Sequence, residues 1–255
     1  MLLNNTIKRA EQRFVPLSGK ESSLHRSLKF HYSGSEGDVE TPVGEYVCDG
    51  RTSKGEIIEI QTGSFGPLKE KLKCLTKTSK VRVVHPIAKQ KHIELYDSDG
   101  NFSRKRKSTR KGSIWDLFKV LIYAPELALQ KNLVIELAII DILEKRVNDG
   151  KGSWRRKGVS ITDRSLEAWH SSILLSKLKD YYLFVPFKKS ECFMVQDLAE
   201  KAGINANLAR KTLYVLTKIG LTEKTGRQGN ASIYRLVTGA NKKRQGEETC
   251  LSSTQ

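Results

Sequence analysis

The chain has 255 residues, of which 45 are Lys or Arg and 28 are Asp or Glu, so its formal net charge at pH 7 is +17. This length allows a buried core in one large domain or two smaller ones, and the charge favours an anionic partner such as nucleic acid or an acidic membrane surface. No apolar run approaches the roughly 20 residues of a membrane span, and the first residues lack the apolar centre of a signal peptide, so we expect a cytoplasmic protein without a membrane partner.

The first part of the chain alternates helical and strand patterns. The spacing of Leu24, Leu28 and Tyr32 predicts a short amphipathic helix. Two segments bounded by glycines, 38–50 and 55–63, are rich in Val, Ile and Tyr and are predicted strands joined by a turn.

A second helix is predicted after Pro67, where Leu68, Leu72 and Leu75 share one face. The segments KVRVVHP and KHIELYDSDG then predict two further strands, the second ending in a Ser-Asp-Gly turn. The order of helix, strands, helix and strand implies an α/β or α+β fold whose sheet is buried between helices.

The middle of the chain contains two basic runs. From Asn101 to Gly112 the sequence is polar, basic and without periodicity, which predicts a loop or a disordered arm. The second basic run extends from Asp149 to Gly158. Between the two runs, SIWDLFKVLIYAPEL is helical in pattern until Pro125, and NLVIELAIIDILEKRV is predicted as a strand.

Residues 165–238 are expected to form the last ordered part of the chain. Gly203 closes one predicted helix and Asn205 begins the next. A strand, a glycine-containing hairpin tip and a returning strand follow. This order resembles a winged helix, whose first helix Ser165–Leu183 would supply. Winged helices mediate either DNA or protein contacts, and for DNA the resemblance implies a groove-facing helix and a phosphate-contacting wing. The residues concerned would be Asn207, Arg210, Lys211 and Tyr214 on the helix, with Lys224 and Arg227 on the wing.

Polar residues occur in the two most strand-like runs. Residues two apart share a strand face, so Glu59 and Gln61 point one way while Ile58 and Ile60 point the other. Asp49 ends the preceding strand, and a hairpin would bring its carboxylate near Glu59. Two convergent carboxylates suit Mg²⁺, for which Mn²⁺ can substitute, and the Gln61 carboxamide could orient a water molecule. The alternative is that these acids face solvent or pair with lysines.

These elements resemble the α-β-β-β-α-β core of the PD-(D/E)XK nuclease superfamily. The likeness rests on the first helix, the strand ending in Asp49, the EIQT strand, the helix after it and the VRVVHP strand. It implies a restriction-endonuclease-like fold in which Asp49 and Glu59 bind the metal, the carbonyl of Ile60 supplies a third ligand and Glu21 acts as an accessory acid. The chain is also similar to bacterial and archaeal proteins of unassigned role that share an EIQT-x-x-F strand, a KL helix, a VHPI strand and an RRK segment.

One residue departs from the nuclease pattern. Gln61 stands where most members have a lysine, which polarises the attacking water or stabilises the transition state. The site therefore tolerates glutamine, as some active members do, or it is weak, needs a second metal, or is not catalytic. A lysine from the next helix could compensate: Lys69, Lys71 and Lys73 are available, and Lys69 and Lys73 lie one turn apart on one face. His85, in VVHP, is either a phosphate donor or a packed histidine.

The two basic runs are candidate contacts for phosphate groups, which bind cations without regard to sequence. Solvated loops would also explain them. The residues concerned are Arg104, Lys105, Arg106 and Lys107 in the first run and Arg155 and Arg156 in the second. Next to the second run, Trp154 either stacks on a base or ribose or packs beneath its neighbours.

Cysteine spacing and other motifs exclude several kinds of site. Cys48, Cys74, Cys192 and Cys250 form no CxxC pair, so we expect reduced structural thiols and neither a zinc site nor a disulfide framework. The chain also lacks a Gly-rich phosphate loop and an HExxH sequence, so the enzyme classes that use them have no support.

The sequence thus predicts four parts: a flexible segment (1–18), a nuclease-like domain with basic loops (19–164), a winged helix (165–238) and a disordered tail (239–255). We expect a Mg²⁺-dependent DNA endonuclease that hydrolyses phosphodiester bonds in restriction, defence or repair, with the winged helix holding or selecting duplex DNA. The alternatives are a non-catalytic DNA-binding regulator and an RNA-directed nuclease or binder. Because one active site cuts one strand at a time, double-strand cleavage would suggest a homodimer.

Overall fold

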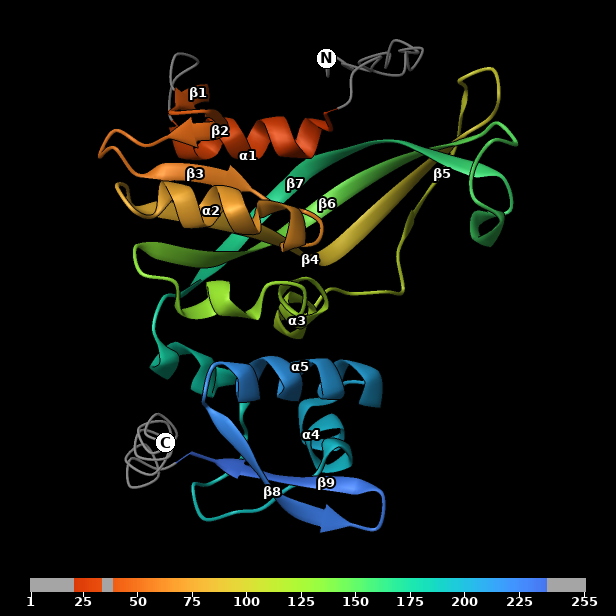
Figure 1. The fold of residues 1–255 in the computed structure, drawn as a ribbon. Helices are drawn as coiled ribbons and strands as arrows, with labels where there is room; N and C mark the ends of the chain where they lie inside the picture. Colours follow the sequence, from red (N-terminus) through yellow and green to blue (C-terminus); the bar gives the residue numbers. More distant parts are fainter. Residues whose placement is uncertain (1–20, 34–38, 238–255) are drawn as a thin grey trace, which may run out of the picture. The chain divides into compact units, whose positions relative to one another are not determined.

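The computed structural model describes residues 21–33 and 39–237 of the chain, and Figure 1 draws their helices and strands as a ribbon. Helices accompany a mixed sheet, so the predicted α+β class is confirmed. The segments predicted for residues 1–18 and 239–255, and Cys250, lie outside the described residues. Within the described residues, no helix combines the length and apolar character that crossing a membrane requires.

The helices and strands follow in the order α1 (Ser23–Ser33), β1 (Val39–Val43), β2 (Tyr46–Arg51), β3 (Ile57–Ile60), α2 (Lys69–Leu75), β4 (Val81–Tyr96), β5 (Phe102–Lys107), α3 (Leu117–Leu121), β6 (Leu133–Asn148), β7 (Val159–Leu175), α4 (Val195–Ala202), α5 (Ala206–Lys218), β8 (Thr222–Gln228) and β9 (Ala231–Leu236). Short 3-10 helices lie between them: η2 (Gly66–Leu68), η3 (Ile114–Asp116), η4 (Pro125–Leu129), η5 (Trp154–Arg156) and η6 (Leu178–Phe184). The larger sheet has the strand order β1-β2-β3-β4-β6-β7, with β5 paired to β4, and β8 and β9 form a second sheet.

The first predicted strand segment is a hairpin of two strands, β1 and β2. Val43 pairs with Tyr46 around Gly44, whose φ of +60° suits a residue without a side chain. The prediction of a single strand over residues 38–50 is wrong, because the chain reverses at Gly44. Strand β3 then pairs antiparallel with β2.

Helix α2 connects β3 to β4, and these two strands run parallel. A parallel pair requires a crossover of this kind. Pro67 lies in the 3-10 turn before the helix, and Leu72 and Leu75 are buried, as predicted. All four residues of β3 are buried, so Glu59 is enclosed together with the isoleucines of the strand.

Strand β4 continues through Pro86, where the sequence predicted two separate strands. Residues 81–84 of β4 pair with β3, and residues 92–96 pair with β5. Pro86 lies between these two stretches, so its missing N–H removes no hydrogen bond from either ladder.

The first basic run contains strand β5, where a loop or disordered arm was predicted. This strand pairs antiparallel with β4, from Phe102 opposite Tyr96 to Lys107 opposite His92. The predicted turn before it is present, with Gly100 at a φ of +84°. All six residues of β5 are exposed. Lysine and arginine are tolerated there because charged side chains protect a sheet edge from pairing with other chains.

Strand β7 occupies most of the segment predicted as the first helix of the winged helix, so that helix at Ser165–Leu183 is wrong. Leu166, Trp169 and Ile173 have nearly helical spacing, but pairing with β6 overrides this local preference. The 3-10 helix η6 replaces the end of the predicted helix. The predicted boundary between residues 164 and 165 therefore falls inside a strand.

The elements predicted after residue 190 are present. Gly203 ends α4 with a φ of +61°, and the Asn205 side chain caps α5 by accepting a hydrogen bond of 2.9 Å from the Leu208 N–H. Strands β8 and β9 form the antiparallel hairpin, and Phe193 bridges to Tyr234 of β9.

The chain divides into two compact units that alternate along the sequence. The first unit comprises the described residues up to Ser27 together with 88–111 and 140–169, and the second comprises 28–87, 112–139 and the residues from His170. Within the second unit, one hydrophobic cluster includes residues on both sides of the predicted domain boundary, among them Leu72, Phe118, Leu198 and Leu213.

Candidate functional site

Four elements bring together two acids and two lysines, all of them residues of the second unit. Asp49 on β2 and Glu59 on β3 come from neighbouring antiparallel strands, while Lys29 comes from α1 and Lys71 from α2. The Lys71 Nζ lies 2.6 Å from the Glu59 Oε1, and the Lys29 Nζ lies 3.3 Å from the Asp49 Oδ1. We call these four residues the acid-lysine cluster.

Asp49 contacts both the neighbouring strand and the first helix. Its Oδ2 accepts a hydrogen bond of 2.7 Å from the Ile60 N–H. Its Oδ1 faces Lys29, which is buried and also lies 3.1 Å from the Glu40 Oε1. A buried ammonium requires anionic partners, so Glu40 and Asp49 stabilise the charge of Lys29.

Glu59 is only 4 % exposed, although it is an acid in a strand of isoleucines. Burial raises the pKa of Glu59, the Lys71 ammonium opposes this, and the Asp49 charge adds to the rise. Burial, together with Glu59, also raises the pKa of the Cys48 thiol to about 12. Cys48 is therefore a protonated, buried thiol, in agreement with the structural role expected from the sequence.

One of the three lysines on α2 contacts Glu59, and it is Lys71. The same Nζ donates a hydrogen bond of 2.7 Å to the Val47 carbonyl, which fixes the ammonium between β2 and β3. The other two pair elsewhere, Lys69 with Glu126 at 2.5 Å and Lys73 with Glu70 at 3.2 Å. Helical geometry alone singled out Lys69 and Lys73, whereas the contact belongs to the residue between them.

Gln61 and His85 both interact with the turn that follows β3. The Gln61 side-chain amide donates to the Ser64 carbonyl, and its backbone carbonyl accepts a hydrogen bond of 2.7 Å from the His85 Nδ1. Burial lowers the pKa of His85, and its ring meets Phe65 edge to face with centroids 5.8 Å apart. This geometry agrees with a packed histidine. The Gln61 side-chain amide, for its part, is occupied by a hydrogen bond within the turn after β3.

Glu21, predicted as an accessory acid on the first helix, lies two residues before α1 and belongs to the first unit. Its Oε1 lies 3.4 Å from the His25 Nδ1. Its assigned role rests on the family resemblance alone.

The acid-lysine cluster can be tested for its fit to a divalent cation. Mg²⁺ commonly takes one or two carboxylates and fills its other positions with water and phosphate oxygens, which Asp49 and Glu59 can satisfy. Among residues 21–33 and 39–237, no group of three His, Cys, Asp or Glu side chains could hold a metal ion. A cation held by Asp49 and Glu59 would have to replace a lysine as the counter-charge of each carboxylate, and it would take its remaining ligands from water and a substrate.

Sequence reasoning missed a second buried acid in this unit, Glu136 on β6. Its carboxylate accepts hydrogen bonds from the Tyr32 hydroxyl at 2.7 Å, the Arg82 Nη1 at 2.8 Å and the Ser172 hydroxyl. Arg82 also pairs with Glu56 at 2.7 Å. Burial and Glu136 raise the pKa of Tyr32. Because each charge in this network has partners, the network has a structural role and connects α1 to the sheet. In the sequence, the only signal for a buried acid was the apolar run around Glu136.

The predicted DNA-binding residues of the first unit lie at its surface. Arg104, Lys105, Arg106 and Lys107 are exposed on β5, although Lys105 lies 3.6 Å from Glu94 and 3.4 Å from Glu167. The second basic run follows β6, where Arg155 is exposed. The Arg156 Nε instead donates a hydrogen bond of 3.0 Å to the Val159 carbonyl, so this guanidinium also supports the local turn.

The predicted groove-facing residues share one side of α5. Asn207, Arg210 and Tyr214 are exposed and Lys211 is partly buried, whereas the opposite side of the helix is buried. On the following hairpin, Lys224 and Arg227 are exposed.

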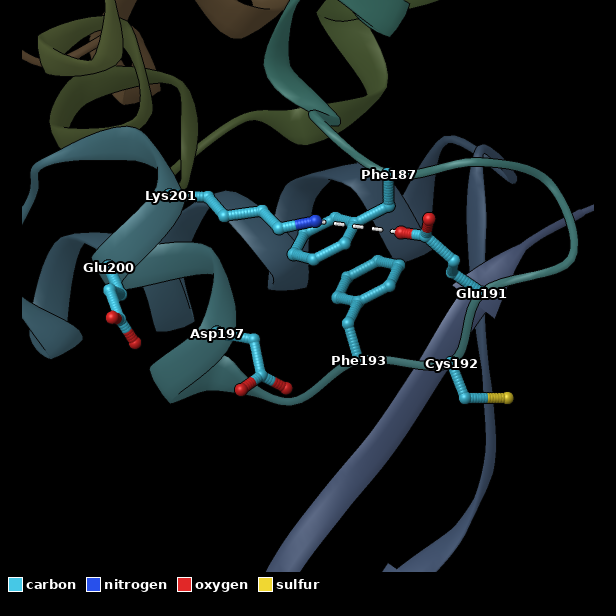
Figure 2. A pocket seen from close by; sticks show the side chains of 7 residues that line it. All are labelled: Phe187, Glu191, Cys192, Phe193, Asp197, Glu200 and Lys201. Atoms are coloured by element: carbon cyan, nitrogen blue, oxygen red, sulfur yellow. Dashed lines mark ion pairs between the residues drawn. The ribbon is translucent and has the colours of Figure 1, made fainter.

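The second unit also has a cavity of about 430 Å³, shown in Figure 2 and lined by Phe187, Glu191, Cys192, Phe193, Asp197, Glu200 and Lys201. The rings of Phe187 and Phe193 stack with centroids 3.9 Å apart. The Lys201 Nζ lies 4.4 Å from the centre of the Phe187 ring and 3.6 Å from the Glu191 Oε2. Lys201 thus occupies the position that a cationic ligand would take, and we assign no ligand to this cavity.

Comparison with known proteins identifies the family. Residues 22–176 match the family described as Domain of unknown function (DUF8091). The chain belongs to this family. An uncharacterized protein of Treponema pallidum (strain Nichols) is 29 % identical over 217 residues, which cover 85 % of this chain and 85 % of that protein. No solved structure matches. The stretch shared with the DUF8091 family contains the whole acid-lysine cluster and strand β5.

Proposed function

We propose that this protein is a metal-dependent DNA endonuclease whose active site is the acid-lysine cluster. The observation that carries the proposal is the position of Lys71, whose Nζ lies 2.6 Å from the Glu59 Oε1 while Asp49 lies on the adjoining strand. The cation that the PD-(D/E)XK pattern expects at position 61 would then come from α2. The element order α1-β1-β2-β3-α2-β4, with β3 and β4 parallel, supports the same proposal.

The residues of the cluster would have distinct roles. Asp49 and Glu59 would hold the divalent cation, which when bound lowers the pKa of a water ligand and stabilises negative charge on phosphate oxygens. The Lys71 side chain is 18 % exposed, so its ammonium can contact an approaching phosphate oxygen from α2. A cation fixed in advance beside developing charge is an effective form of transition-state stabilisation.

DNA as the substrate is supported by the exposed cations elsewhere in the chain. Those on β5, α5 and β8 can contact phosphates in a way that depends on salt and not on sequence. Restriction, defence and repair are all compatible with a nuclease of this kind.

A second candidate is a DNA-binding regulator that does not cleave. It is favoured by the pairing of Asp49 with Lys29 and of Glu59 with Lys71, because both acids already have counter-charges without a metal. The cluster would then serve to hold α1 and α2 against the sheet. Under this candidate, Glu59→Gln would leave DNA affinity unchanged.

The test is cleavage of supercoiled plasmid by the full chain with Mg²⁺ or Mn²⁺, with a matched RNA substrate in parallel. We expect Glu59→Gln and Lys71→Met each to lower the rate about a hundredfold or more, the scale at which loss of a transition-state contact is felt. Lys73→Met is the matched control, because Lys73 lies on the same helix and pairs with the exposed Glu70.

Calorimetric titration with Mn²⁺ gives a readout independent of cleavage. We expect binding by the native protein and loss of binding in Asp49→Asn and Glu59→Gln. DNA binding without cleavage under any metal would overturn the nuclease proposal in favour of the regulator, and preferential cleavage or binding of RNA would overturn the assignment of DNA.

A further inference from the structure

The connection between β6 and β7 in the first unit presents a tryptophan to solvent. Trp154 begins the 3-10 helix η5 at the tip and is 86 % exposed. By contrast, Trp115 in the second unit is buried, as is usual for so large an aromatic side chain. A lone exposed apolar residue is unremarkable by itself, so the construction of the surrounding turn decides its meaning.

Hydrogen bonds and close packing fix this turn. The Gly152 N–H donates a hydrogen bond of 2.8 Å to the Gly158 carbonyl, and the Lys157 N–H donates one of 2.9 Å to the Trp154 carbonyl. A Cβ on Gly152 would lie 2.0 Å from the Val159 carbonyl oxygen, so only glycine allows the two backbone segments to meet. The backbone of the turn is therefore held in one arrangement, and binding need not order a mobile loop to present the exposed indole.

The surroundings of the indole are cationic. Lys151, Arg155 and Lys157 are exposed within the same turn. Segments 88–111 and 140–169 of this unit together contain fifteen Lys or Arg residues against eight Asp or Glu residues. An aromatic face beside cations is the combination that binds single-stranded nucleic acid, since bases stack on the ring and phosphates contact the charges.

We infer that Trp154 is a stacking site for an unpaired nucleobase, so that the protein prefers DNA with a gap, a frayed end or a single-stranded segment over continuous duplex. This inference rests on the proposed function for its nucleic-acid partner and adds the structural class of the substrate. Bases inside a continuous duplex have their faces covered, so an indole can stack only where pairing is interrupted.

An anionic membrane surface also attracts tryptophan and basic residues, but the turn fits it less well. Insertion into a headgroup layer is driven by buried apolar area, and amphipathic membrane anchors present an extended apolar face. From residue 150 to residue 158 the neighbours of Trp154 are glycine, serine, lysine and arginine. One aromatic side chain offers a stacking surface without an apolar face to insert.

The test measures the affinity of the full chain, by fluorescence anisotropy, for continuous duplex DNA and for a duplex of equal length with a short gap. We expect the native protein to prefer the gapped DNA, and Trp154→Ala to weaken gapped binding about tenfold with little effect on continuous duplex. Trp154→Phe should retain most of the preference. Tyr123→Ala is the matched control, because Tyr123 is also an exposed aromatic residue, at 63 %.

Failure of the inference and failure of the proposed function give different results. Metal-dependent cleavage with an unaltered preference for gapped DNA in Trp154→Ala would overturn the stacking site and leave the nuclease proposal standing. Absence of binding to any nucleic acid by the native protein would overturn both. Binding to phosphatidylserine vesicles that is lost in Trp154→Ala, without a gap preference, would assign the turn to a membrane surface.

Discussion

At the scale of single residues, the fold encloses charges and neutralises each with a partner. Lys29, Glu59 and Glu136 are all buried, and each contacts an opposite charge. Removing one member of such a pair leaves a charge in a poorly solvated place, which typically destabilises a protein by about 3–5 kcal/mol. The stability of the candidate site is therefore sensitive to single substitutions, independently of catalysis.

Replacement of Lys71 by methionine should destabilise the protein in a pH-dependent way. At about pH 8 we expect a loss of about 3 kcal/mol, because Glu59 would be buried, charged and unpaired. Burial raises the pKa of Glu59, so the carboxylate is protonated more readily in the fold than in the unfolded chain, and the loss should shrink as pH falls toward 4.5, the ordinary value. Urea unfolding across this range measures the effect. An equal loss at every pH would contradict the charge argument, and the double variant Glu59→Gln, Lys71→Met should lose less than the sum of the single variants.

Glu144 in the first unit gives the opposite pH dependence. Burial would raise its pKa, but hydrogen bonds from Arg164 and Arg146 and the charge of Lys91 outweigh burial and lower the pKa to about 2. Its carboxylate therefore contributes stability, on the order of 3 kcal/mol, that is present above pH 4.5 and lost as pH falls toward 2. We expect Glu144→Gln to be destabilised by at least that amount at neutral pH and to show a shallower dependence of the urea midpoint on pH below 4.5. If the urea midpoint of the variant depended on pH below 4.5 as it does in the native protein, other carboxylates would control the loss of stability in acid.

At the scale of elements, the side chains of α5 that pack in the core lie on the opposite side of the helix from those that are exposed for binding. Its buried side includes Leu208, Leu213 and Leu216, while Arg210 lies on the exposed side. A substitution on the exposed side therefore removes little packing and tests binding directly.

The variant Arg210→Ala, Lys211→Ala should weaken binding to duplex DNA about tenfold without a change in unfolding midpoint. Each lost phosphate contact lowers the slope of log affinity against log salt by about 0.9, so the slope should fall by about two. Affinity measured over a salt series checks both values, with Lys201→Ala on α4 as the control. An unchanged slope would assign this helix to protein contacts, the other use of such elements.

The same elements explain what the sequence could predict. Helices α1, α2, α4 and α5 each have one apolar face and local end signals such as Gly203, so their positions followed from short stretches of sequence. The long strands did not, because the extent of a strand depends on partners distant in sequence. Pro86 therefore misled as a strand end and the spacing in β7 as a helix.

The residues of the candidate site also differ in whether the sequence could predict them. Asp49 and Glu59 could be found because acids are unusual in strand-like runs, and their pairing required only a hairpin. Lys29 could not, since its contact with Asp49 depends on how α1 lies against β2, which no local pattern specifies. Lys71 was one of three candidates on α2, and only the tertiary contact distinguishes it from its neighbours.

At the scale of the whole molecule, the division into two units does not follow the order of the chain. Helix α1 and strands β4, β6 and β7 each begin in one unit and end in the other. Cutting the chain near residue 164 would break β7, so an isolated fragment 165–238 would begin in the middle of a strand.

This interleaving also constrains inheritance. A domain connected by a single linker can be gained, lost or exchanged by one recombination event, whereas either unit of this protein could be exchanged only by joining several breakpoints inside strands. We therefore expect the two units to be inherited together. The DUF8091 match to residues 22–176 contains portions of both units.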